Sequence, residues 1–291
     1  MFDMVSRRGF VSLSAAAAAG LGLAGCSGKK TSEPAGSDAG SAKSSSKKKA
    51  VELQVFAANS LEKALPEVQE LYTEQTGTTF ADTQFKASGD LVEQMKAGAA
   101  VDVLITASKG TMDDAEAAEL VDADTREDMF VNDLVIIRAE GSDTKIEAIA
   151  DVANLDGKIA IGDAKTVPAG KYANQALASV GLYTGTEGDD GEYAPEIADK
   201  VALADKVGTA AAYVSTGDCV AGFVYSSDIF RYDGIEEAFV CPEDSHKPIV
   251  YPGAVAESSE HADEAKAFID FCLTNKKAQK IWAKYGFELS A

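Results

Sequence analysis

The chain has 291 residues, of which 46% are hydrophobic, and it carries a formal net charge of −20. This length exceeds what one mid-sized core accommodates, so it predicts two lobes. The acidic balance argues against a nucleic-acid partner, which would select a basic surface, and it predicts no long-range attraction of an anionic ligand.

Residues 1–25 have the layout of an export signal. The paired Arg7 and Arg8 form a twin-arginine pattern, and a short apolar stretch of small residues leads to Leu-Ala-Gly before Cys26. This end resembles a bacterial lipobox, so we expect cleavage before Cys26 and a lipid on that cysteine. The alternatives are a plain signal peptide with an incidental cysteine, and an ordinary export route. No later stretch is both long and apolar enough to span a bilayer.

Residues 26–50 comprise Cys26 and a segment, 27–50, that is rich in Gly, Ser, Ala and Lys and has no apolar pattern. Such a composition cannot bury a core and predicts a flexible tether. Its six lysines outnumber Glu33 and Asp38. The positive balance suits an anionic membrane surface, although a solvated spacer explains it equally well. We expect an exported protein anchored by lipid at the outer face of the cytoplasmic membrane.

Strands and helices alternate over the rest of the chain. Apolar runs predict strands over 51–57, 80–85, 101–105, 134–138, 158–162, 220–225, 238–241 and 249–256. Helical spacing predicts helices over 60–75, 91–97, 111–120, 144–153, 169–180, 207–215, 261–273 and 276–284. Pro66 falls inside the first helix and should bend it. This alternation predicts an α/β fold of parallel sheets with helices on both faces.

The order of these elements predicts two lobes of discontinuous sequence. Lobe 1 would contain 51–132 and 249–291, and lobe 2 would contain 133–248. The chain would cross between them near 131–134 and again near 246–252. Two such segments form a hinge that permits the lobes to close on a ligand.

Cysteine and histidine usage gives little evidence for a metal site or an enzyme. With Cys26 lipidated, three cysteines remain: Cys219, Cys241 and Cys272. Cys219 and Cys241 flank strands that we expect to be neighbours, and they could form one disulfide. Neither His246 nor His261 lies in a cluster with the spacing of zinc or iron–sulfur ligands. The chain lacks the sequence motifs of a serine-hydrolase elbow, a P-loop or a zinc protease, so we expect no enzymatic activity.

Five widely spaced positions lie where helices should begin. They are Ser60, Ser88, Ala169, Val207 and Tyr225. A helix start presents free backbone N–H groups and the positive end of the helix dipole. Several starts that converge on one point would form a neutral cage for a small anion.

The side chains at these positions allow other interpretations. Ser60 and Ser88 can donate a hydroxyl to an oxyanion, but serine at a helix start is most often an ordinary N-cap. Val207 could offer only its backbone N–H, and Tyr225 could be a core tyrosine. Ala169 stands between a proline and a glycine, so little side-chain bulk would block an anion there.

Short stretches spread over most of 51–291 resemble the periplasmic molybdate-binding proteins of ABC transporters, in that family's order. They are residues 55–61, 99–103 with 106–108, 162–163 with 167–173, 222–228, 242–247 and 284–287. The resemblance implies a two-lobed type II periplasmic binding fold with a two-segment hinge. It places the family's ligand positions on Ser60, Ser88, Ala169, Val207 and Tyr225.

The same resemblance implies a tetrahedral oxyanion, molybdate or tungstate, held by hydroxyl and N–H groups without a cofactor or direct metal ligands. Asn59, where the family often has alanine, and Gly89, where a hydroxyl residue is common, depart from the family pattern. We expect a monomeric lipoprotein that delivers the anion to a membrane permease. The alternatives are a receptor for sulfate or phosphate, an exported enzyme, and a sensory lipoprotein on the same scaffold.

Overall fold

The computed structural model describes residues 51–290. The predicted signal peptide, the predicted lipidation site Cys26 and the predicted tether lie outside these residues. Within the described range, no helix combines the length and the apolar character that crossing a membrane requires.

The first lobe is built on a sheet of six strands. The strand order is β13 (Glu288–Leu289), β6 (Glu127–Asn132), β12 (Ile249–Val255), β5 (Val103–Ile105), β2 (Val55–Ala58) and β4 (Gln84–Lys86). β2 runs parallel to β4 and β5, whereas β12 runs antiparallel to β5 and β6. A separate parallel pair joins β1 (Glu52–Leu53) to β3 (Thr79–Phe80).

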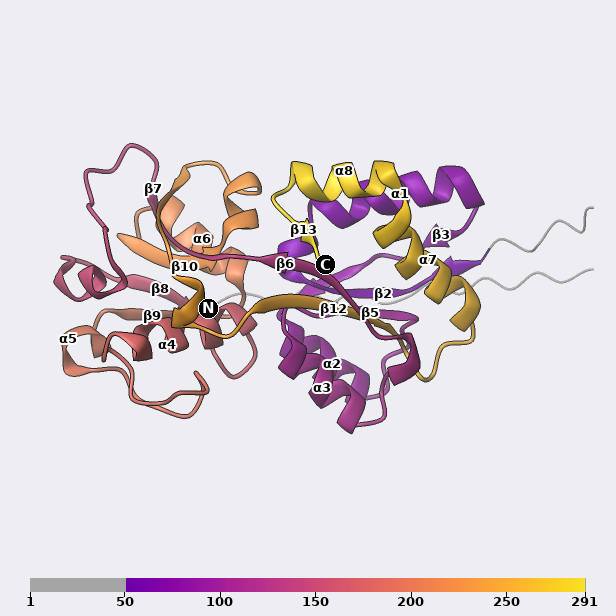
Figure 1. Ribbon diagram of the computed structural model, residues 1–291, viewed down its shortest axis with the longest axis horizontal. Coiled ribbons are helices and arrows are strands. Elements are labelled where there is room, and N and C mark those ends of the chain that lie inside the picture. The colour runs from indigo at the N-terminus through magenta and orange to yellow at the C-terminus, as the bar shows by residue number, and fades with distance from the viewer. Residues whose placement is uncertain (1–50, 291) are drawn as a thin grey trace, which may run out of the picture. The chain divides into compact units, whose positions relative to one another are not determined.

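Helices cover both faces of this sheet (Figure 1). One face carries α1 (Ala64–Thr76), α7 (Ala262–Thr274) and α8 (Lys276–Lys284). The other carries α2 (Ser88–Lys96) and α3 (Lys109–Ala117). Two 3-10 helices, η1 (Asn59–Leu61) and η2 (Ala123–Thr125), complete the lobe. Phe268 and Trp282 are fully buried in the core of this lobe, and the centroid of the Trp282 ring lies 4.4 Å from that of Phe130.

The second lobe is built on a sheet of five strands. Their order is β11 (Ile235–Val240), β7 (Leu134–Ala139), β10 (Ala221–Tyr225), β8 (Ile159–Gly162) and β9 (Val201–Ala204). α6 (Val207–Ser215) covers one face and α4 (Pro168–Ser179) the other, with the short α5 (Pro195–Ala198) near its edge (Figure 1). The 3-10 helices are η3 (Ile149–Asn154), η4 (Ser226–Phe230) and η5 (Glu243–Ser245).

Two segments join the sheets. The chain leaves β6 of the first sheet and enters β7 of the second with only Asp133 between them. It returns through η5 between Val240 and Ile249. The predicted two-lobed α/β fold with a two-segment hinge is thereby confirmed.

Several local predictions were wrong. The sheets are mixed rather than parallel, because β7, β11, β6, β12 and β13 pair antiparallel with their neighbours. α1 begins at Ala64, so Pro66 lies in its first turn, where a missing N–H removes no helical hydrogen bond. The helix predicted over 144–153 is the shorter 3-10 helix η3.

The Cys219–Cys241 disulfide that the sequence left open does not form, since both cysteines are buried free thiols. β7 separates β10 from β11, so the flanking strands are not neighbours. Because both run antiparallel to β7, they point the same way, and Cys219 precedes β10 whereas Cys241 follows β11. The two thiols therefore lie at opposite ends of the sheet, beyond the 4.4–6.8 Å that typically separates disulfide Cα atoms.

Candidate functional site

The structure brings all five predicted site residues together around one cavity. Ser60 and Ser88 come from the first lobe, and Ala169, Val207 and Tyr225 come from the second. The cavity is small, about 10 Å³, and each of the five residues is buried. The remaining lining residues are Ala58, Asn59, Lys86, Ala87, Ala107, Val167 and Pro168.

Helix starts converge on this cavity, as the sequence predicts. Ser88 and Val207 are the first residues of α2 and α6, and Ala169 is the second residue of α4. The next N–H of each helix is already engaged: Gly89 donates to Thr166 O at 3.0 Å, Gly170 to Val167 O at 2.9 Å and Gly208 to Asn59 Oδ1 at 3.1 Å. Since first-turn N–H groups have no acceptor within their own helix, those of Ser88, Ala169 and Val207 are the candidate donors.

Close packing of glycines sets the position of the α4 start. Gly170 lies against the last residue of β8, where a Cβ on Gly170 would be only 2.0 Å from Gly162 O. Pro168 stands at the first position of α4, where its missing N–H costs nothing. The Pro-Ala-Gly sequence therefore lets the backbone at Ala169 approach both the sheet and the cavity.

The hydroxyl of Ser88 is held so that its proton is available. Its Oγ accepts a hydrogen bond from Ala107 N at 3.0 Å. A hydroxyl that accepts in this way keeps its single O–H for another acceptor. Ser88 is thus an N-terminal helix residue whose side chain caps no N–H of its own helix.

The hydroxyl of Ser60 is oriented by a chain of hydrogen bonds that begins at the hinge. Asn132 Oδ1 accepts from Ser226 Oγ at 2.7 Å and from Asp133 N at 3.0 Å, so its amide nitrogen points the other way. Asn132 Nδ2 then donates to Tyr251 Oη at 3.4 Å, and Tyr251 Oη lies 2.9 Å from Ser60 Oγ. Either hydroxyl can donate in this contact, and when Tyr251 donates, the Ser60 proton is left for the cavity.

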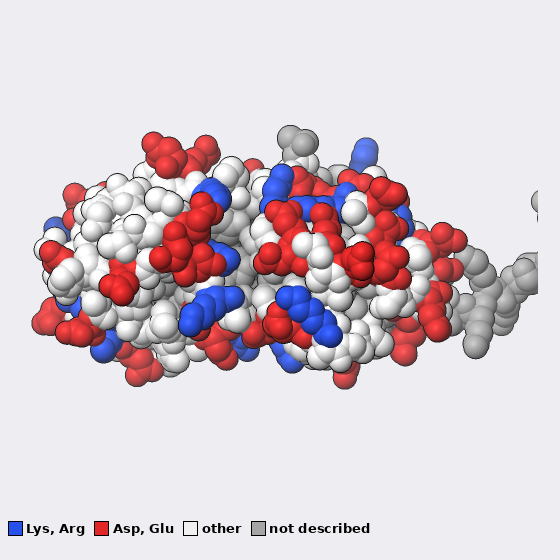
Figure 2. Space-filling model, turned by 90° about the horizontal axis from the view of Figure 1, so that it is seen from below, with Lys and Arg blue, Asp and Glu red and all other residues white. Residues whose placement is uncertain are grey.

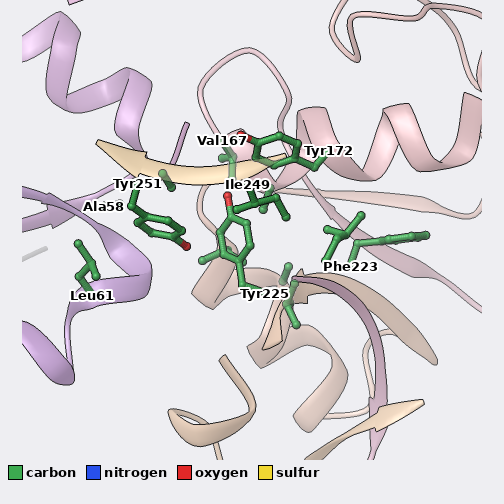
Figure 3. Packing of buried hydrophobic residues seen from close by; sticks show 14 of the residues in the cluster. Ala58, Leu61, Val167, Tyr172, Phe223, Tyr225, Ile249 and Tyr251 are labelled. Atoms are coloured by element: carbon green, nitrogen blue, oxygen red, sulfur yellow. The ribbon is translucent and has the colours of Figure 1, made fainter. Parts of the chain in front are cut away.

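Tyr225 has a buried hydroxyl without a hydrogen-bond partner among the described residues. Its side chain is 1% exposed, and its ring lies 5.7 Å from that of Tyr251 and 6.5 Å from that of Tyr172 (Figure 3). Burial raises the pKa of Tyr225 well above its usual value of 10, so the phenol remains protonated. An unpaired buried hydroxyl costs roughly 1–3 kcal/mol, which an acceptor in the cavity would recover.

All but one of the side chains that line the cavity are uncharged. Lys86 is the exception, but it is exposed and its Nζ donates to Gln94 Oε1 at 3.1 Å. Acidic side chains are spread over the surface of both lobes (Figure 2). Among the described residues, no group of three or more His, Cys, Asp or Glu side chains could hold a metal ion. The cavity therefore offers hydrogen-bond donors in a neutral wall, and no carboxylate that would repel an anion.

Three residues of this site were not predicted to act there: Tyr251, Asn132 and, as a contact across the lobes, Asn59. Tyr251 lies in the predicted strand over 249–256, where a tyrosine in an apolar run was the only signal. Asn132 stands at the predicted crossing but has no distinguishing pattern. Asn59 was noticeable only as a departure from the resembled family, and the structure shows its side chain bonded to the other lobe.

Comparisons with known proteins agree with this fold. Residues 53–288 match the family model described as bacterial extracellular solute-binding protein. The chain is 33% identical over 242 residues to the molybdate-binding protein ModA of Escherichia coli (strain K12), which covers 81% of this chain and 89% of that protein. It is 31% identical over 237 residues to ModA of Haemophilus influenzae, and the match covers 80% of this chain and 88% of that protein.

Among solved structures, the periplasmic molybdate-binding protein of Azotobacter vinelandii superimposes with a TM-score of 0.69. The match covers 82% of this chain and all of that chain, with 20% sequence identity. At this identity the similarity establishes the fold. Taken with the family match over most of its length, it shows that the chain belongs to the bacterial extracellular solute-binding proteins.

Proposed function

We propose that this chain is the extracytoplasmic binding subunit of an ABC importer for molybdate, with tungstate as an equivalent ligand. The observation that carries the proposal is the phenol of Tyr225, which has no hydrogen-bond partner among the described residues and is buried beside two serine hydroxyls and three helix starts. The ModA proteins of two other bacteria support the choice of anion. Ser60, Ser88, Ala169, Val207 and Tyr225 would supply the hydrogen bonds.

The cavity must widen beyond its present volume of about 10 Å³ to admit an anion, and a cage of donors would then select that anion by size and by protonation. Sulfate has shorter bonds than molybdate, so some donors would be left unpaired, at roughly 1–3 kcal/mol each. Hydrogen phosphate carries an O–H that needs an acceptor, and the three backbone N–H groups proposed here cannot accept one. Molybdate and tungstate are alike in size and charge, so the cavity would bind them with similar affinities.

The N-terminal segments and the hinge would serve the location of the protein and the delivery of the anion. A lipid on Cys26 and the tether over 27–50 would hold the binding lobes at the outer face of the cytoplasmic membrane, within reach of a permease. The two-segment hinge would let the lobes open to release the anion. The family match supports export, and the Leu-Ala-Gly-Cys sequence supports the lipid anchor.

The Tyr225→Phe variant separates binding from stability. We expect its molybdate affinity to fall by about 10- to 100-fold, since a hydrogen bond to a charged group contributes about 1.5–3 kcal/mol. We expect its stability without ligand to stay the same or rise, because the substitution removes an unpaired buried hydroxyl. Calorimetric titration with molybdate and urea unfolding without it give the two quantities.

Tyr183→Phe is the matched control. The Tyr183 hydroxyl is also in the second lobe, but it accepts from Gly191 N at 2.8 Å and does not line the cavity. This variant should lose stability and keep its affinity. Equal molybdate affinity in Tyr225→Phe and the unaltered chain would contradict the assigned site.

A further inference from the structure

Polar side chains next to the site join the two lobes directly. They flank the cavity on both sides: Asn59 and Glu62 adjoin Ser60 in the first lobe, and Asp228 and Arg231 follow Tyr225 in the second. We infer that Asn59, Glu62 and Arg231 form a latch, which holds the lobes together before an anion binds and slows release of the anion afterwards. The effect on release rests on the proposed function, whereas the effect on closure does not.

Asn59 provides the most direct contact. Its side chain is buried, and Oδ1 accepts from the backbone N–H of Gly208 on α6 at 3.1 Å. Its amide nitrogen donates to Glu62 Oε2 at 2.6 Å, which fixes the orientation of the amide. A Cβ on residue 208 would lie 2.7 Å from Asn59 Oδ1 and 2.1 Å from the Tyr232 hydroxyl, so glycine is what allows this approach.

Arg231 provides a second, charged contact across the same gap. Its guanidinium forms an ion pair with Asp228 of its own lobe, and its Nη2 lies 3.4 Å from Glu62 Oε2 of the other lobe. The Arg231 side chain is 1% exposed and the Glu62 side chain 33% exposed, so water screens this contact only in part. Asp228 also accepts from Tyr225 N at 3.0 Å, so the charged pair is connected to the site.

These contacts are made by protein groups alone. They connect side chains that would separate if the hinge opened, and they leave Val207 N–H, next to Gly208, for the ligand. A lobe–lobe contact made by protein groups raises the population of the closed state, and the apparent affinity of a ligand that binds between closed lobes rises with that population. The affinity of the site is therefore set partly by residues that need not touch the anion.

Hydrogen exchange of the Gly208 amide in the full-length chain, with no anion present, tests the latch. In the Asn59→Ala variant we expect the peptide that spans Gly208 to exchange about fivefold faster, the change that the loss of one hydrogen bond produces. Glu62→Gln should act in the same direction, because it weakens the contact with Arg231 and the support of the Asn59 amide.

Asn275→Ala is the matched control. Asn275 Oδ1 likewise accepts from backbone N–H groups at a helix start, those of Lys277 and Ala278 on α8, but within one lobe. This variant should leave exchange at Gly208 unchanged. Unchanged exchange at Gly208 in Asn59→Ala would overturn the latch.

The rate at which molybdate dissociates tests the second part. We expect release about fivefold faster from Asn59→Ala than from the unaltered chain, and no change in Asn275→Ala. If molybdate fails to bind the unaltered chain while exchange at Gly208 rises in Glu62→Gln, which keeps the Asn59 acceptor in place, the latch stands and the proposed ligand is wrong. If molybdate binds and leaves both chains at the same rate, the role of the latch in release is refuted.

Discussion

Replacing Gly170 with alanine is expected to lower the free energy of unfolding by about 3 kcal/mol, at the upper end of what overpacking usually costs. The added Cβ would stand 2.0 Å from the carbonyl oxygen of Gly162 and 3.1 Å from Ala164 N, and neither backbone atom can move without shifting the end of β8. Because α4 must then move, the N–H of Ala169 moves with it, and molybdate binding should be lost as well. Urea unfolding and calorimetric titration measure the two effects.

Gly110→Ala is the control for this prediction. Gly110 is also in the first turn of a helix, α3, but a Cβ there meets no atom within 4 Å. Alanine favours helix over glycine by up to about 1 kcal/mol, so this variant should be as stable as the unaltered chain or more stable. A Gly170→Ala protein with unchanged stability would show that α4 does not pack against β8 as described.

Asp228→Asn is expected to cost a comparable amount, about 3 kcal/mol, by a different mechanism. Asp228 is fully buried and pairs with Arg231, so the neutral side chain leaves a buried guanidinium without its main partner. Burial raises the pKa of Asp228, and the adjacent Arg231 opposes that rise. For a folded unit of this size the loss corresponds to a fall in Tm of about 6–12 °C, measurable by calorimetry.

Asp270→Asn shows what loss of a surface pair does. Asp270 pairs with Lys266 at 2.5 Å, but its side chain is 53% exposed, so the substitution should change stability by less than about 1 kcal/mol. If the two aspartate variants melted at the same temperature, the buried pair would have no special role in the second lobe.

The elements that follow from local pattern were largely predictable from the sequence. The helix predicted over 207–215 is α6, and those over 261–273 and 276–284 match α7 and α8 within one residue, because apolar spacing and a sharp start define each of them. Strand direction was not predictable in this way. β7 and β12 pair antiparallel with their neighbours because the chain crosses between sheets, and that pairing depends on partners far away in sequence.

The candidate site was predictable only in part, for a related reason. Ser60, Ser88, Ala169, Val207 and Tyr225 could be named because helix starts and a family resemblance point to them, and the structure places them around one cavity. Whether they hold an anion stays a prediction. The support from Asn132 and Tyr251 and the bond from Asn59 to Gly208 join residues 119 and 149 positions apart, and no local pattern encodes such contacts.

Calorimetric titration of the full-length chain with molybdate, tungstate, sulfate and phosphate in turn tests the central claim most directly. We expect tight binding of molybdate and tungstate with similar affinities, binding of sulfate and phosphate at least tenfold weaker, and loss of molybdate affinity in Tyr225→Phe. Preferred binding of sulfate or phosphate, or binding of none of the four anions, would contradict it.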